Sequence, residues 1–192
     1  MCIRDRVVSF GGSLGARPIN AAMTELLRWS FHDQSVQNIH ATGKSGWESM
    51  SAELEADGIH PGRNGNVWLR EYIDDMPRCL AAADLIICRA GAITLSELQA
   101  QGKAAILIPS PNVAENHQYH NAMALVHKGA AALIEDKDLT GDRLIEEVRR
   151  LTANPQKLHE MGRKAQESAI LDSCERIYQV ITDVLNQAAC GK

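Results

Sequence analysis

The sequence has no CxxC cysteine pair, no net positive charge and no long apolar run, and each absence excludes a class of protein. Its five cysteines are odd in number and scattered, which argues against a disulfide framework and against a zinc site. The formal net charge of -4 leaves no electrostatic footprint for nucleic acid. The most apolar region, 80–108, is interrupted by charged side chains and cannot supply the ~20 apolar residues of a membrane helix. These absences favour a protein of the reducing cytoplasm, either soluble or peripheral to a membrane.

The amino-terminal residues also lack the apolar core of a signal peptide. Residues 1–6, half of which are charged, run directly into an apolar segment at 7–10, so we expect them to be a truncated or non-native leader. The other 186 residues, 7–192, are long enough to bury the core of one domain. A content of 45% hydrophobic and 23% charged residues is ordinary for a soluble globular protein.

Short apolar runs alternate with helical patterns, which predicts right-handed βαβ units and a parallel α/β sheet of about six strands. The predicted strands are 7–10, 36–41, 67–69, 85–88, 104–108 and 131–134, and the predicted helices between them are 17–29, 46–56, 76–83, 93–101 and 117–128. From about residue 138 the pattern is wholly helical. One apolar face there contains Leu144, Ile145, Val148 and Leu151, and another contains Ile177, Ile181, Val184, Leu185 and Ala188.

The segment 88–97 closes an apolar strand on a glycine turn and opens a helix that carries the Thr94 hydroxyl and the Glu97 carboxylate. Ligands of open α/β sheets lie outside the carboxyl ends of the strands, where helix N-termini offer free N–H groups to phosphate. The segment therefore predicts a site for a nucleotide ligand. An alternative is that Thr94 and Glu97 form a capping box, which satisfies two backbone amides of the helix itself.

A second strand-to-helix connection, 11–16, has the sequence GGSLGA and is neither a GxGxxG motif nor a Walker A loop. Its backbone amides could surround a phosphate while Ser13 donates a hydroxyl hydrogen bond. The alternative is a tight turn that simply requires glycine. A third polar loop, 109–118, ends in His117 and Gln118, of which Gln118 offers a hydrogen-bond donor and an acceptor. His117 has either a chemical role or the commoner one of a helix-start histidine that faces solvent or backbone.

The remaining histidines and carboxylates predict no metal site. His117 and His120 lie three residues apart without accompanying carboxylates. Asp74 and Asp75 are adjacent, so their side chains point apart, and we expect the pair to start the helix at 76. His40 is expected to be a packing or surface residue.

Five segments, in this order and at this spacing, resemble the bacterial MurG family of UDP-N-acetylglucosamine:undecaprenyl-pyrophosphoryl-MurNAc-pentapeptide N-acetylglucosaminyltransferases. They are 11–17 (GGSLGAR), 72–76 (YIDDM), 83–92 (ADLIICRAGA), 94–97 (TLSE) and 117–122 (HQYHNA). The resemblance is to the C-terminal half of that family and covers 7 to about 189. It implies a GT-B glycosyltransferase, in which two Rossmann-like domains face each other across a cleft. This chain would be the domain that binds the nucleotide sugar, without the N-terminal acceptor domain.

The resemblance also implies roles for single residues. Ser13 would lie at the diphosphate, the backbone of Ile73 would meet the uracil, and Glu97 would accept hydrogen bonds from the ribose hydroxyls. Gln118 would bind the GlcNAc hydroxyls, beside a histidine that replaces a glutamine of some members. The predicted binding residues are Ser13, Ile73, Ala92, Ile93, Thr94, Leu95, Ser96, Glu97 and Gln118, with Gly12, Gly15, Arg89, Gly91 and His117 as additional candidates.

The activity that the resemblance implies is inverting transfer of GlcNAc from UDP-GlcNAc to the 4-hydroxyl of lipid-linked MurNAc-pentapeptide, a step of peptidoglycan synthesis. Two helix N-termini could stabilise the departing UDP, so we expect neither cofactor nor metal for binding of UDP-GlcNAc. In the family the acceptor loop and the candidate base belong to the N-terminal domain. We therefore expect no catalytic residue in this chain, binding with little turnover, and a last helix without its docking surface. The full-length enzyme would lie on the inner face of the cytoplasmic membrane.

Two other functions fit the same residues. The chain could be the UDP-sugar-binding subunit of a split GlcNAc transferase, paired with a separate membrane-bound acceptor subunit. It could also be a non-catalytic nucleotide-sugar-binding module that regulates a partner, because a fold does not fix a function. An acceptor domain encoded in frame upstream, or an acceptor gene nearby, would separate these possibilities.

Overall fold

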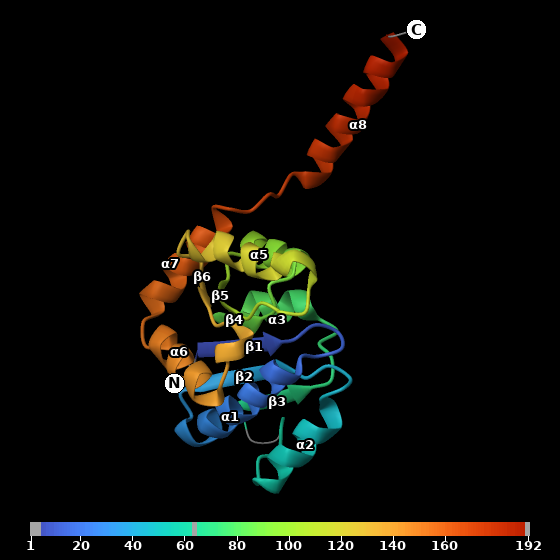
Figure 1. Ribbon diagram of the computed structural model, residues 1–192. Helices are drawn as coiled ribbons and strands as arrows, with labels where there is room; N and C mark the ends of the chain where they lie inside the picture. The colour runs from blue at the N-terminus through green and yellow to red at the C-terminus, as the bar shows by residue number, and fades with distance from the viewer. Residues whose placement is uncertain (1–4, 63–64, 191–192) are drawn as a thin grey trace.

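A computed structural model describes residues 5–62 and 65–190, the last three by their backbone alone, and contains a parallel sheet flanked by helices (Figure 1). The strands are β1 (Asp5–Phe10), β2 (Val36–Ala41), β3 (Val67–Arg70), β4 (Leu85–Cys88), β5 (Ala104–Leu107) and β6 (Ala131–Leu133). Their order is β3-β2-β1-β4-β5-β6, and every pair is parallel. The predicted fold class is confirmed. β1 begins at Asp5, two residues before the predicted strand, while residues 1–4 of the predicted leader lie outside the described residues.

The helices are α1 (Arg17–Asp33), α2 (Trp47–Ala56), α3 (Met76–Ala82), α4 (Ala92–Ala100), α5 (His117–Val126), α6 (Gly141–Thr152), α7 (Pro155–Gln166) and α8 (Ser173–Cys190). Short 3-10 turns, η1 (Ala114–Asn116) and η2 (Asp136–Asp138), precede α5 and α6. The main difference from the predicted bounds is at the end of α1, which continues past residue 29. It ends where Gln34 adopts a left-handed conformation with φ of 60° and its N–H donates to the Ser30 carbonyl.

The core lies on both faces of the sheet. All residues of β4 and β5 are buried, as expected for continuous apolar runs in a parallel sheet that is covered on both faces. On one face, side chains of α1 and α6 such as Leu26 and Val148 pack together over the strands. On the other face, α3, α4 and α5 contribute Leu80, Leu98 and Leu125. Because the chain leaves β1 toward β2 and leaves β4 toward β5, a crevice opens outside the carboxyl ends of β1 and β4.

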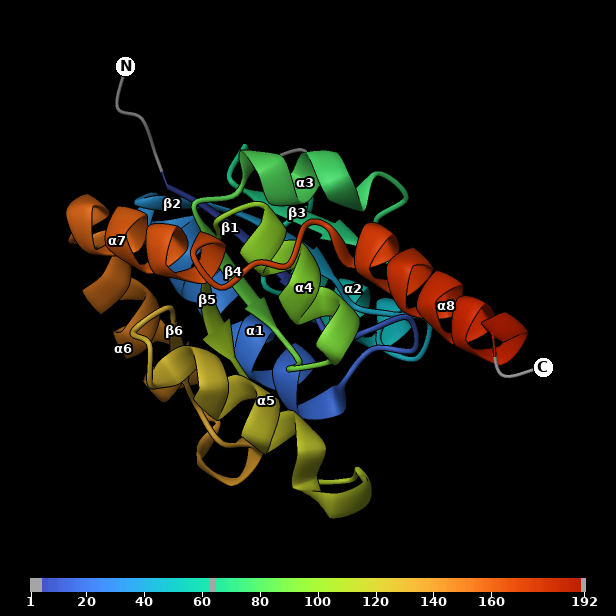
Figure 2. The same cartoon turned by 90° about the horizontal axis from the view of Figure 1, so that it is seen from above.

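Helix α8 projects away from this body (Figures 1 and 2). Its apolar side chains are in solvent, including Ile177, Ile181, Val184 and Leu185, whereas the side chain of Ala188 lies outside the described part. The described apolar side chains of α8 therefore do not pack on the body of this domain, and the expected loss of a docking surface stays a prediction. No helix within the described residues is both long enough and apolar enough to cross a bilayer.

Removal of residues 173–192 should therefore change the free energy of unfolding by less than about 0.5 kcal/mol, because the described apolar side chains of α8 are exposed and do not pack on the body. Urea unfolding followed by tryptophan fluorescence tests this, since all three tryptophans, Trp29, Trp47 and Trp68, lie in the body. A loss of more than about 2 kcal/mol would show that α8 supports the core.

Candidate functional site

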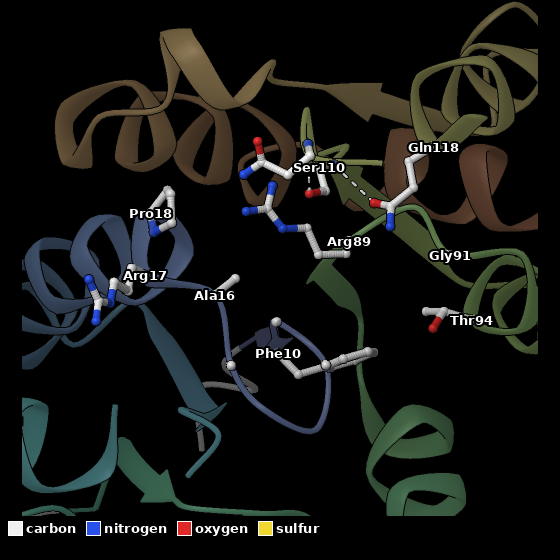
Figure 3. A pocket seen from close by; sticks show the side chains of 13 residues that line it. Phe10, Ala16, Arg17, Pro18, Arg89, Gly91, Thr94, Ser110 and Gln118 are labelled. Atoms are coloured by element: carbon white, nitrogen blue, oxygen red, sulfur yellow. Dashed lines mark hydrogen bonds between the residues drawn. The ribbon is translucent and has the colours of Figure 1, made fainter. Parts of the chain in front are cut away.

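A cavity of about 560 Å³ lies at the carboxyl ends of β1, β4 and β5, at the predicted crevice. Side chains and glycines from three strand-to-helix connections converge on it (Figure 3). Six of the predicted residues line it, namely Gly12, Gly15, Arg89, Gly91, Thr94 and Gln118. The other lining residues are Phe10, Gly11, Ala16, Arg17, Pro18, Ser110 and Asn112. Ser110 and Asn112 belong to the polar loop 109–118 but are not among the predicted site residues, because only their place after a strand distinguishes them in the sequence.

Helices α1, α4 and α5 begin around this cavity, and none of them has a side-chain hydrogen bond at its N-cap. Helices α2 and α3, which begin elsewhere, also lack such a hydrogen bond, whereas α6 and α7 are capped by the side chains of Thr140 and Asn154. Uncapped helix N-termini present free N–H groups and a partial positive charge. The cavity is therefore suited to an anion such as a phosphate.

The capping-box interpretation of Thr94 and Glu97 is wrong. The N-cap of α4 is Gly91, with extended backbone at φ of -69° and ψ of 142°, so Thr94 and Glu97 both lie inside the helix. The capping box requires its threonine at the N-cap itself. Thr94 instead lines the cavity and Glu97 is exposed, so both side chains are available to a ligand.

The glycine loop at 11–16 is packed directly against the chain that leaves β2. A Cβ atom on Gly15, whose φ is +82°, would lie 2.0 Å from the Thr42 carbonyl oxygen. A Cβ atom on Gly43 would lie 2.1 Å from the Gly15 nitrogen. Gly12, with φ of +92°, would meet nothing within 4 Å, and Ser13 is exposed beside it. The tight-turn interpretation therefore accounts for Gly15, while the open side of the loop faces the cavity.

A buried polar network lies beneath this loop. The His40 ring contacts the Ser9 hydroxyl through Nδ1 at 2.8 Å and the Asn20 amide oxygen through Nε2 at 3.2 Å. The Asn20 amide nitrogen donates to the Thr42 carbonyl at 2.9 Å, the same oxygen that faces Gly15. Burial lowers the pKa of His40 to about 4, so the ring is neutral at pH 7. The predicted packing role of His40 is confirmed, and the network fixes the surface on which the loop lies.

The Arg89 side chain, which follows β4, contacts the segments that follow β5 and β6. Its Nη1 donates to the carbonyl oxygens of Ile108 and Pro109, both at 3.2 Å, and pairs with the Asp136 carboxylate. The two charged side chains are 16% and 18% exposed. Sequence reasoning did not find Asp136, because it lies 47 residues from Arg89 in a turn with no motif of its own.

Gln118 reaches the cavity from the first turn of α5, and its Oε1 accepts from the Ser110 N–H at 2.9 Å (Figure 3). The adjacent His117 faces backbone, since its Nδ1 contacts the Ala114 carbonyl oxygen at 3.0 Å. Glu115 and Asn116 reverse the chain before it with φ of 51° and 50°. Two alternatives were open for His117, a chemical role and a helix-start histidine that faces solvent or backbone. The contact with Ala114 corresponds to the second.

The other predicted residues lie outside this cavity. Ile73 is buried and lines a second hollow of about 610 Å³ with Trp68 and Tyr72 beside the edge strand β3. Ala92 and Leu95 face a small hollow against α5, where Leu95 belongs to the core. The hydroxyl of Ser96 donates to the Ala92 carbonyl, and Ile93 is 79% exposed.

Among the described side chains, those of 5–62 and 65–187, no three of His, Cys, Asp or Glu come close enough to hold a metal ion. Asp75 is the N-cap residue of α3, so the expected position of the helix start is confirmed, but its side chain makes no capping hydrogen bond. Its carboxylate pairs with Arg78 at 3.1 Å.

Comparison with known proteins assigns the chain to a family. Residues 6–177 match the model of the glycosyltransferase family 28 C-terminal domain. The chain is 42% identical over 92% of its length to the UDP-N-acetylglucosamine--N-acetylmuramyl-(pentapeptide) pyrophosphoryl-undecaprenol N-acetylglucosamine transferase of Desulforamulus reducens, of which it covers 47%. It is also 42% identical over 96% of its length to the transferase of that name from Acetivibrio thermocellus, covering 49% of that protein. The chain thus spans about half the length of these relatives.

A solved structure is similar over the same extent. The crystal structure of Acinetobacter baumannii MurG superposes with a TM-score of 0.80 at 28% identity, over 95% of this chain and 51% of that one. The match supports the fold of a GT-B C-terminal domain for this chain. The chain belongs to glycosyltransferase family 28, of which it contains the C-terminal domain.

Proposed function

We propose that this chain binds UDP-GlcNAc for an inverting glycosyltransferase that transfers GlcNAc to the 4-hydroxyl of lipid-linked MurNAc-pentapeptide. The observation that carries this proposal is the convergence of the glycine loop and three uncapped helix N-termini on one cavity. Such a cavity suits a diphosphate. The choice of sugar and acceptor follows from the names of relatives at 42% identity.

In the proposed complex the diphosphate lies between the loop at 11–16 and the N-terminus of α4. Ser13 and Thr94 supply hydroxyl hydrogen bonds to it. Glu97, exposed on α4, accepts from the ribose hydroxyls, and the uracil meets the backbone of Ile73 beside the hollow at β3. The GlcNAc ring is directed toward Gln118.

In this mechanism the chain stabilises a leaving group. Negative charge develops on the phosphates of UDP as the bond to the anomeric carbon breaks, and preorganised N–H groups at helix N-termini stabilise that charge. No metal or cofactor is required for this role in our proposal. The acceptor site and the general base are assigned to the half of the relatives that this chain does not span, so the chain alone would bind UDP-GlcNAc with little transfer. The complete enzyme would act on its lipid-linked acceptor at the inner face of the cytoplasmic membrane.

Glu97→Gln should weaken UDP-GlcNAc binding about 10- to 100-fold, because charge-assisted hydrogen bonds to the ribose become neutral ones. Calorimetric titration with UDP-GlcNAc, UDP-glucose and UDP-GalNAc measures both the affinity and the choice of sugar. The matched control is Glu48→Gln, which neutralises an exposed carboxylate on a different helix, α2. This variant should bind UDP-GlcNAc as the wild type does. Failure of the wild-type chain to bind any of the three nucleotide sugars, or full affinity in Glu97→Gln, would contradict the proposed site.

A further inference from the structure

We infer that Arg89 is a positioning residue that sets the orientation of the Gln118 amide, and that Gln118 therefore meets its ligand as a hydrogen-bond donor. The inference rests on the proposed function and concerns the sugar end of the same cavity. Arg89 lines this cavity, and a cationic side chain beside a phosphate site would ordinarily be assigned to the phosphate. The contacts of its guanidinium point to a different role.

The charge of Arg89 is already neutralised by a carboxylate of this chain. Asp136 pairs with Nη1, and both side chains are more than four-fifths buried. A buried pair of this kind has little net charge to offer a ligand, and its members are costly to separate. Nη1 also donates to the Ile108 and Pro109 carbonyls, so the guanidinium joins the turn after β4 to the chain that follows β5 and to η2 after β6.

One of these contacts fixes a particular peptide group. The carbonyl of Pro109 and the N–H of Ser110 belong to the same planar unit, with oxygen and hydrogen on opposite sides. Arg89 holds the oxygen at 3.2 Å, and the N–H on the other side donates to Gln118 Oε1 at 2.9 Å. Pro109 itself has no N–H, so Ser110 supplies the first amide hydrogen after Ile108.

The orientation of Gln118 follows from this peptide group. A side-chain amide has one acceptor oxygen and one donor nitrogen, and the Gln118 oxygen is engaged by Ser110. The group left for the cavity is the Nε2 amide, which recognises an acceptor oxygen on the ligand. If the Pro109–Ser110 peptide turned over, its carbonyl would face Gln118 and favour the opposite amide orientation. Arg89 opposes that rotation by binding the oxygen in its present place.

The test compares UDP-GlcNAc with UDP, which lacks the sugar. We expect Arg89→Met combined with Asp136→Asn, which leaves no unpaired charge, to weaken UDP-GlcNAc binding by about tenfold, the scale of one hydrogen bond. Binding of UDP should change by less than about twofold, because the phosphate amides are untouched. Arg89→Lys, which keeps a donor for the Pro109 carbonyl, should restore at least part of the UDP-GlcNAc affinity. Circular dichroism is the control that checks whether each variant is folded.

A double-mutant cycle with Gln118→Ala gives a readout that a purely structural role would not move. Gln118→Ala should weaken UDP-GlcNAc binding in the wild-type background. It should have almost no further effect in the background that combines Arg89→Met with Asp136→Asn. An unchanged ratio of UDP-GlcNAc to UDP affinity in folded Arg89 variants, or additive effects in the cycle, would overturn the inference while leaving the proposed function standing. A wild-type chain that binds neither ligand would overturn both.

Discussion

Gly15→Ala should lower the free energy of unfolding by about 3 kcal/mol or more and abolish UDP-GlcNAc binding. The new Cβ would lie 2.0 Å from the Thr42 carbonyl oxygen, a backbone atom that cannot rotate away as a side chain could. Thr42 is itself held by the buried Asn20 amide, so relief of the clash has to come from the loop. Movement of the loop displaces the start of α1 and the amides that face the cavity. Urea unfolding and calorimetric titration measure the two effects.

Gly12→Ala is the matched control for this prediction. Gly12 is in the same loop and has a similar positive φ of +92°, but a Cβ atom there would meet nothing within 4 Å. Its substitution should cost only the left-handed backbone strain, about 1–2 kcal/mol. The difference between the two variants isolates the close approach to Thr42. Equal losses of unfolding free energy in the two variants would mean that backbone strain alone accounts for the requirement for glycine at both positions. The loop would then not be held against the chain that leaves β2.

Most of the fold could be predicted because its causes are local. The apolar runs of β4 and β5 and the helical patterns between strands determine a parallel sheet. The place of the cavity followed as well, since parallel strands bring their carboxyl ends to one edge. The bounds of α4 were harder. A Thr-x-x-Glu pattern fits a capping box, yet the extended backbone of Gly91 starts the helix earlier, and no pattern in the sequence distinguishes the two.

The contacts that decide the chemistry were not predictable, because they join residues remote in sequence. Asp136 has no periodicity or motif that relates it to Arg89. The donation from Ser110 to Gln118 depends on the orientation of one peptide plane, which the strand pattern leaves open. Of the nine predicted binding residues, seven lie outside the main cavity, namely Ser13, Ile73, Ala92, Ile93, Leu95, Ser96 and Glu97, and their roles are proposals that ligand binding has to decide.

The free energy of unfolding should decrease as the pH is lowered from 6.5 to 4, because of His40. Burial lowers its pKa in the folded chain from 6.5 to about 4, whereas in the unfolded chain the ring takes up a proton near pH 6.5. Between these values the unfolded state binds more protons, so the contribution of His40 is fully present above pH 6.5 and is lost as pH falls through about 4. The expected loss is about 2–3 kcal/mol.

His40→Gln should remove this part of the pH dependence, because glutamine keeps a donor and an acceptor for Asn20 and Ser9 but does not titrate. Free energies of unfolding measured in urea at pH 7.5 and pH 4 should then differ less in the variant than in the wild type, by the loss assigned to His40. Carboxylates titrate over the same range in both proteins and cancel in the comparison. His127→Gln, which makes the same replacement at an exposed position, is the matched control. An equal pH dependence in wild type and His40→Gln would mean that water reaches the network beneath the glycine loop, so that Thr42 is held less rigidly than its contacts indicate.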